Sequence, residues 1–168
     1  MSYIMRAEIR IDNFLLKVDI RDLLLNIWKV CDDSNVDSIH NNIVNNMSYI
    51  RETWHYDYDL RFSQVLIHLG YLPNSIGFWF YLEEDEILKK QGYKPREYTF
   101  WGSVYDKDGQ LLKETRYSLV KDLERSHIEK IIFGGFVREG TEIYDIMVYE
   151  LKLKSRREKL LKIGSYGS

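Results

Sequence analysis

The chain has 168 residues, a formal net charge of −2, and 45% hydrophobic and 30% charged residues. This balance is typical of one globular domain and excludes a chain that is disordered throughout. One cysteine, Cys31, excludes an intrachain disulfide, and the sequence contains neither a signal peptide nor a run of about 18 apolar residues. We therefore expect a cytoplasmic protein with one compact domain over residues 1–164, a frayed tail over 165–168 and no membrane partner.

The first predicted element is a β-hairpin. Apolar residues alternate with charged ones over residues 5–11 and again from Phe14 to Val18, and Asp12-Asn13 between them has turn composition. A period of two residues is typical of strands that bury one face. The segment therefore predicts two antiparallel strands.

Helical spacing follows the hairpin. Apolar residues at steps of three and four predict helices over residues 20–31, 36–54, 60–69 (with Asp59 as the expected N-cap) and 83–91. Asp19 is the expected N-cap of the first of these, and Cys31 is expected as a small core residue. Residues 78–82 are ambiguous between a strand and a helix start.

A second hairpin and two more helices complete the chain. Alternation over residues 98–104 and 115–119 flanks the loop Asp106-Lys107-Asp108-Gly109, and Ser126-His127-Ile128-Glu129 forms a capping box. A long final helix starts near Thr141. The predicted fold class is α+β, with two antiparallel hairpins that can combine into one sheet, packed with five or six helices.

No group of residues predicts catalysis or metal binding. The histidines, His40, His55, His68 and His127, have no metal-ligand spacing, and no nucleophile or phosphate-loop motif occurs. The loop at Asp106 begins like a calcium site but lacks the later glutamate ligand, and a hairpin turn explains it. We expect no catalytic residue, no metal and no cofactor.

An aromatic patch is the first candidate binding site. Its predicted members are aromatic or basic residues from the middle of the chain, namely Trp54, His55, Tyr56, Tyr58, Arg61, Trp79, Tyr81 and Trp101. Aromatic residues and arginines dominate the binding energy of many interfaces. Alternatively, the segment around His55 connects two helices, and its tyrosines cover the core.

The basic end of the chain is the second candidate site. Six cations and one acid lie between Lys152 and Lys162, and the predicted phosphate contacts are Lys154, Arg156, Arg157 and Lys159. These cations could bind nucleic acid while tyrosines stack on bases. Alternatively, they form a solvated helix end, where the helix dipole favours cations.

Two groups of motifs cover about the middle half of the chain. The first is Arg51-Glu52-Thr53-Trp54 with Asp59-Leu60-Arg61-Phe62-Ser63-Gln64 and the helix to Gly70, and the second is Trp101-Gly102, the loop Asp106 to Gly109, Lys121-Asp122-Leu123 and Ser126 to Glu129. Together they resemble a pattern in small uncharacterised bacteriophage and prophage proteins. The resemblance implies a phage-like origin and no activity, ligand or catalytic residue.

Three functions stay open from the sequence. The first is a non-enzymatic binding protein that contacts a host protein, such as a phage accessory protein or an inhibitor of a host factor. The second is a nucleic-acid or nucleotide binder that uses the basic final helix. The third is an enzyme, which would need a pocket where His55 or His127 meets a carboxylate.

Overall fold

The computed structural model describes residues 2–73, 82–106 and 108–166, with side chains for residues 7–73, 82–106 and 108–162. The chain forms two compact units, Met1–Lys94 and Pro95–Ser168, and each has its own buried core. One compact domain over residues 1–164 stays a prediction. No helix in the described ranges has both the length and the apolar composition that crossing a bilayer requires.

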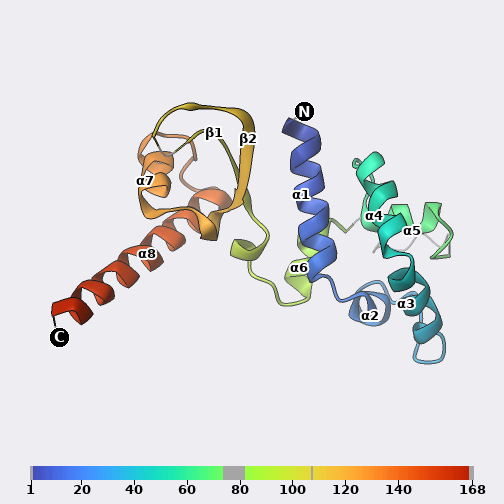
Figure 1. The fold of residues 1–168 in the computed structure, drawn as a ribbon. Helices are drawn as coiled ribbons and strands as arrows, with labels where there is room; N and C mark the ends of the chain where they lie inside the picture. Colours follow the sequence, from blue (N-terminus) through green and yellow to red (C-terminus); the bar gives the residue numbers. More distant parts are fainter. Residues whose placement is uncertain (1, 74–81, 107, 167–168) are drawn as a thin grey trace. The chain divides into compact units, whose positions relative to one another are not determined.

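The first unit is helical in its described residues (Figure 1). Its helices are α1 (Ser2–Lys17), α2 (Ile20–Asp22), which continues as a π-helical turn over Leu23–Ile27, α3 (Val36–Asn45), α4 (Met47–Tyr56), α5 (Phe62–His68) and α6 (Glu84–Lys90). The predicted N-cap is confirmed, because the Asp19 side chain accepts a hydrogen bond from the Asp22 backbone N–H at 3.1 Å. Of the ambiguous segment 78–82, residues 78–81 lie outside the described residues.

The hairpin predicted for residues 5–18 is wrong, because this segment is helix α1. Ala7, Ile11 and Phe14 are separated by four and three residues, so they share one helical face, and all three are buried. A strand that buried Phe14 would also bury Leu16, whose side chain is 83% exposed. The apolar residues of this segment fit both the period of a strand and the period of a helix. The helix is favoured because it buries Ala7, Ile11 and Phe14 on one face and leaves Leu16 exposed.

The helix predicted over residues 36–54 is two helices, because it is interrupted at Asn46. This residue has φ −112° and ψ 17°, and its side-chain amide donates to the Asn42 carbonyl at 2.7 Å. A side chain that bonds the backbone in this way competes with helical hydrogen bonds. The predicted buried stripe is nevertheless confirmed at Ile43, Ile50 and Trp54.

Four aromatic rings form the centre of the first unit. The Trp54 ring stacks on Phe62 with 5.2 Å between centroids, and Phe14 meets these two rings edge-on at 5.6 and 5.2 Å. Trp28 lies 5.9 Å from Phe62. Because the rings come from α1, α4, α5 and the segment after the π-helical turn, this cluster joins elements that are distant in sequence.

A buried carboxylate joins three helices of the same unit. The Glu84 side chain accepts a hydrogen bond from the Phe62 backbone N–H at 3.1 Å and lies 3.4 Å from the Arg10 guanidinium. It therefore satisfies an amide in the first turn of α5, where no intrahelical acceptor exists. Burial raises the pKa of Glu84, and the positive charge of Arg10 offsets this effect only in part.

The second unit contains the sheet. Its elements are a 3₁₀ turn over Pro95–Glu97, strands β1 (Phe100–Tyr105) and β2 (Leu111–Leu119), a 3₁₀ turn over Val120–Asp122, and helices α7 (Arg125–Phe133) and α8 (Glu142–Tyr166). β1 and β2 pair antiparallel with Ser103 opposite Arg116, which confirms the second predicted hairpin. The described fold is thus α+β, with one hairpin where two were predicted and eight α-helices where five or six were predicted.

The core of the second unit lies between the hairpin, α7 and α8. Ile128 and Ile131 of α7 pack with Met147 of α8 and with Val120 at the end of the hairpin. The partly buried Trp101 of β1 packs against this cluster. The hairpin is therefore held to the helices by one apolar contact surface.

Helix α7 begins two residues earlier than predicted. Glu124 has an extended backbone, and the chain is already helical at Arg125, so Ser126 lies inside the first turn and the predicted capping box is wrong. The helix ends at Phe133, and Gly135 behind it adopts a φ of +75°. His127 consequently lies in the first turn of α7, which is the part of the helix that borders the hairpin.

A buried ion pair anchors the start of the hairpin to α8. Glu150 is 0% exposed, and the Arg96 guanidinium donates to its two oxygens from Nε at 2.6 Å and from Nη2 at 3.2 Å. The same guanidinium lies 5.9 Å from the centre of the Tyr149 ring. Because Arg96 lies shortly before β1, the pair fixes where the first strand leaves α8.

Loss of Arg96 should be costly. Arg96→Ala leaves the Glu150 carboxylate buried without a countercharge, so we expect the free energy of unfolding to fall by about 3–5 kcal/mol. The double variant Arg96→Met/Glu150→Leu removes both charges and should lose far less. Urea denaturation of the three proteins measures the difference. A double variant as unstable as Arg96→Ala would contradict the importance of the unpaired charge.

Candidate functional site

Trp54 and Trp101, two members of the predicted aromatic patch, pack in the cores of their units. The Trp54 indole is 0% exposed, and its Nε1–H donates to the Leu60 carbonyl at 2.7 Å. Trp101 belongs to the second unit, where it packs against the core. Trp79 and Tyr81 lie outside the described residues.

His55 and Arg61 form ion pairs within the first unit. His55 Nε2 lies 2.9 Å from Asp12 Oδ1, and Arg51 donates to both Asp12 oxygens, at 2.7 and 2.9 Å. The Arg51 guanidinium beside Asp12 holds the pKa of that carboxyl below its ordinary value. Arg61 pairs with Glu83 at 2.8 Å. His55 does meet a carboxylate, but the contact ties α4 to α1 and Arg51 shares it.

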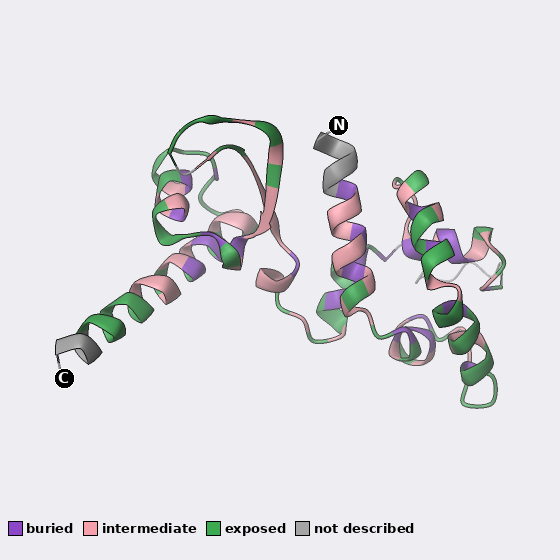
Figure 2. Cartoon of the chain, in the orientation of Figure 1, coloured by how far each residue is buried: buried purple, intermediate pink, exposed green. Residues whose placement is uncertain are grey.

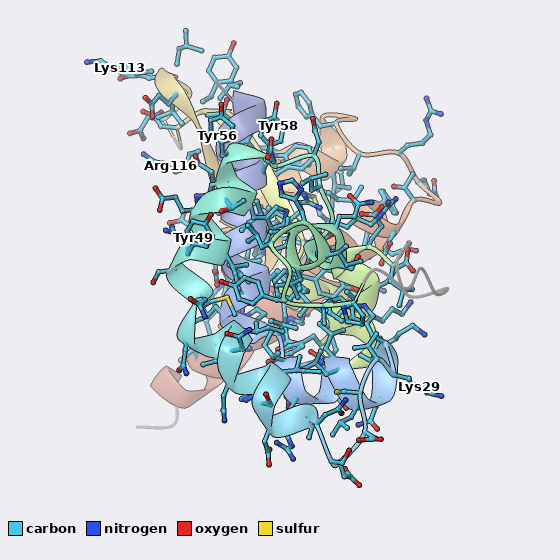
Figure 3. The ribbon with its side chains drawn as sticks, turned by 90° about the vertical axis from the view of Figure 1, so that its right-hand side faces the viewer. Lys29, Tyr49, Tyr56, Tyr58, Lys113 and Arg116 are labelled. Carbon is cyan, nitrogen blue, oxygen red and sulfur yellow. The ribbon has the colours of Figure 1, made fainter. Side chains whose placement is uncertain are left out.

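Exposed tyrosines remain on α4. Tyr56 is 86% exposed and Tyr49 is 56% exposed, and both project from α4 about two turns apart (Figure 3). Tyr58, just after the helix, is half-buried. Among the predicted patch residues that the structure describes, Tyr56 is the one with a largely exposed ring.

A polar hollow lies between the hairpin and α7 in the second unit. Its volume is about 440 Å³, and its charged lining comprises four carboxylates and two cations, namely Asp106, Asp108, Asp122, Glu124, Arg116 and Lys130. Acidic side chains outnumber basic ones, so the hollow carries a net negative charge when His127 is neutral. A ligand with positive charge would complement it.

An apolar hollow of about 440 Å³ adjoins the polar one. It is lined by residues 101–106 on one side and by His127, Lys130, Ile131 and Phe136 on the other. Phe136 is 72% exposed. The two hollows share lining residues, including Ser103 and His127, so they are neighbours, and we term them together the hairpin groove.

Ser103 and His127 meet in the hairpin groove without forming a catalytic pair. The serine Oγ lies 3.4 Å from His127 Nε2, at the outer limit of a hydrogen bond. Ser103 lies within a paired strand and not at an exposed strand-to-helix turn. Within the described residues, no carboxylate orients the other ring nitrogen of His127, as an activated nucleophile would require. The described residues also hold no group of three His, Cys, Asp or Glu side chains suited to a metal ion.

The predicted phosphate contacts are divided between two environments. Lys154 Nζ donates to the Lys121 carbonyl at 2.7 Å. Arg157 lines a hollow of about 700 Å³ between α7 and α8, where carboxylates already pair with Arg125. The charges of this larger hollow thus largely satisfy one another.

Arg156 and Lys159 lie farther along α8 and are exposed. Together with Lys152 they border a separate hollow of about 440 Å³. Figure 2 shows this distal part of the helix as mostly exposed. Leu160 and Leu161 beside it are 62% and 74% exposed.

Sequence reasoning missed the hairpin groove because each of its residues has a local explanation. Asp106 and Asp108 belong to a turn, and His127 to a helix start. The one available signal was Phe136, a large apolar residue directly after the Gly134-Gly135 helix end. A glycine pair leaves little neighbouring side-chain surface to cover such a ring.

Asp12 and Glu84 should make unfolding respond to pH in opposite ways. The pKa of Asp12 lies below its ordinary 3.8, so its stabilisation is complete above that value and is lost as pH falls through the folded-state pKa. The pKa of Glu84 lies above its ordinary 4.5, so its favourable contribution is present below that value and is lost as pH rises through the folded-state pKa.

The matched variants are Asp12→Asn and Glu84→Gln. We expect the stability advantage of the wild type over Asp12→Asn to shrink from about pH 7 to pH 3, and its advantage over Glu84→Gln to grow. Urea denaturation across this range measures both differences. Parallel trends for the two variants would contradict the assigned pKa directions.

Comparison with protein-family models, curated proteins and solved structures gave no match for this chain. Functional inference therefore rests on the hairpin groove and the distal half of α8.

Proposed function

We propose that this chain is a non-enzymatic binding protein that acts by protein–protein contact, with the hairpin groove as its docking surface. The observation that carries the proposal is the joining of an apolar and an acidic hollow between β1 and α7. Depressions with an apolar floor and a few polar groups are the usual form of binding sites. Val104 and Tyr105, at 47% and 55% exposed, add apolar surface at its border.

The proposed partner is a host protein, and the proposed place of action is the cytoplasm of the cell that makes the chain. The resemblance to phage proteins supports a host partner. The single cysteine supports a reducing compartment. An accessory protein or inhibitor needs no reacting groups, which suits the loose contact between Ser103 and His127.

Phe136→Glu should abolish partner capture. The substitution places a charge on the exposed apolar wall of the groove, and we expect recovery of a specific partner to fall at least about tenfold, which corresponds to about 1.4 kcal/mol. Affinity purification of the tagged full chain from host lysate, followed by quantitative mass spectrometry, measures this ratio.

Phe133→Glu is the matched control. Phe133 is 79% exposed on the same helix end but does not line the groove. Partner recovery should be unchanged in this variant, and both variants should unfold at the wild-type urea concentration. Equal losses from the two substitutions would place the contact outside the groove.

The distal half of α8 supports a second candidate function, nucleic-acid binding. Its support is the exposed set of Lys152, Arg156 and Lys159 around one hollow. Tyr149, 52% exposed on the same helix, could stack on a base.

Arg156→Glu/Lys159→Glu should abolish such binding. Fluorescence anisotropy with a labelled single-stranded oligonucleotide of about 20 nucleotides would show an affinity that falls steeply with salt in the wild type. Lys113→Glu changes an exposed cation on β2 and is the control (Figure 3). Binding that ignores salt or survives the double substitution would remove this candidate.

A further inference from the structure

The hydrogen-bond pattern of the hairpin shows which backbone groups of β1 face away from β2. The described sheet has two strands, so β1 has one partner and one free edge. The Val120 backbone N–H donates to the Thr99 carbonyl at 3.0 Å, which identifies these opposed residues as a hydrogen-bonded pair. Such pairs alternate along an antiparallel ladder. The backbone groups of Phe100 and Gly102 therefore point to the free edge.

Gly102 keeps this part of β1 close to its neighbour. A Cβ atom at this position would lie 2.6 Å from a ring carbon of Tyr117, which is the opposed residue on β2. The tyrosine ring thus covers one face of the strand at Gly102. The N–H and C=O groups of Gly102 lie in the plane of the sheet and not on the face that the ring covers.

The apolar half of the hairpin groove follows the free edge of β1. Six successive residues, 101–106, line it, and its described lining includes none from β2. Successive strand residues point to opposite faces, so a hollow that touches all of them runs along the edge and not over one face. His127 and Ile131 of α7 supply the opposite wall. A strand edge facing a helix is one arrangement that accepts an extended peptide.

We propose that an extended segment of a partner protein adds to the free edge of β1 as a third strand. This inference rests on the proposed function and names its binding mode. The backbone groups of Phe100 and Gly102 would bond the segment, and an apolar side chain of the segment would lie between Ile131 and Phe136. The regular part of β1, from Phe100 to Ser103 before the register shift, could pair with a segment about 14 Å long.

The charge of the groove selects the chemistry of this segment. Asp106 and Asp108 lie at the turn end of β1, and Asp122 and Glu124 extend the acidic lining. A lysine or arginine next to the apolar anchor complements this end, whereas an acidic segment would be repelled. The proposed occupant is therefore a strand that alternates apolar and polar residues and carries at least one cation.

A peptide-display library tests the inference. Random ten-residue segments are selected against the full chain, with counter-selection against Phe136→Glu. We expect enriched peptides to carry alternating apolar residues and a net positive charge. Each enriched peptide is then synthesised in two forms, with N-methyl groups on the amides of either its odd or its even positions. Only one of these two sets of amides can donate to β1.

Methylation of the set that faces β1 should raise the Kd at least about tenfold, and methylation of the other set should change it by less than about threefold. Asp108→Lys should weaken the basic peptides, and Glu114→Lys, on an exposed β2 position outside the groove, should not. Fluorescence anisotropy measures all of these constants.

Three outcomes would overturn strand addition. In the first, the enriched peptides bind equally well with either methylation pattern, so this binding mode fails. If partner capture still depends on Phe136, the proposed function nevertheless stands. In the second, no peptide is enriched over Phe136→Glu. In the third, light scattering detects a dimer that Phe136→Glu dissociates, which assigns the edge to a second copy of the chain.

Discussion

The hairpin groove depends on the ion pair between Arg96 and Glu150. Glu150 is fully buried on α8, and a carboxylate removed from water requires a partner with both charge and hydrogen bonds. Arg96 meets that requirement from the turn just before β1, so one electrostatic constraint fixes the start of the strand. Trp101 then packs against the core of the unit and holds β1 to it. The groove begins at Trp101 and follows β1 toward the turn, beyond both attachments.

Local sequence patterns predicted the elements in which one physical effect decides the secondary structure. The second hairpin follows from alternation and a glycine turn, and α8 from a long run without breakers. The first hairpin failed because Ile11 and Phe14 satisfy a strand and a helix equally well until their neighbours are packed. Asn46 shows the same limit on a smaller scale, since its side-chain bond to Asn42 outweighs a continuous apolar stripe.

Functional residues were harder to predict than secondary structure. Large aromatic side chains can stabilise a core or form a contact surface, and composition does not separate these uses. Trp54 and Trp101 pack in cores, and the proposed contact surface consists instead of residues such as Phe136 and Asp108. These residues come together only when β1, α7 and the segment after Gly135 pack against one another. They lie far apart in the sequence, so no local pattern predicts that they meet.

The close approach of Gly102 to Tyr117 links two positions in the history of this protein. A side chain at position 102 would meet the tyrosine ring, so a larger residue there requires the ring to move or position 117 to become smaller. A substitution that enlarges position 102 alone strains the hairpin, and one that shrinks position 117 alone leaves it underpacked. Variation at position 102 is therefore coupled to the side chain at position 117, whereas Gly102 tolerates a smaller residue at 117 without any clash.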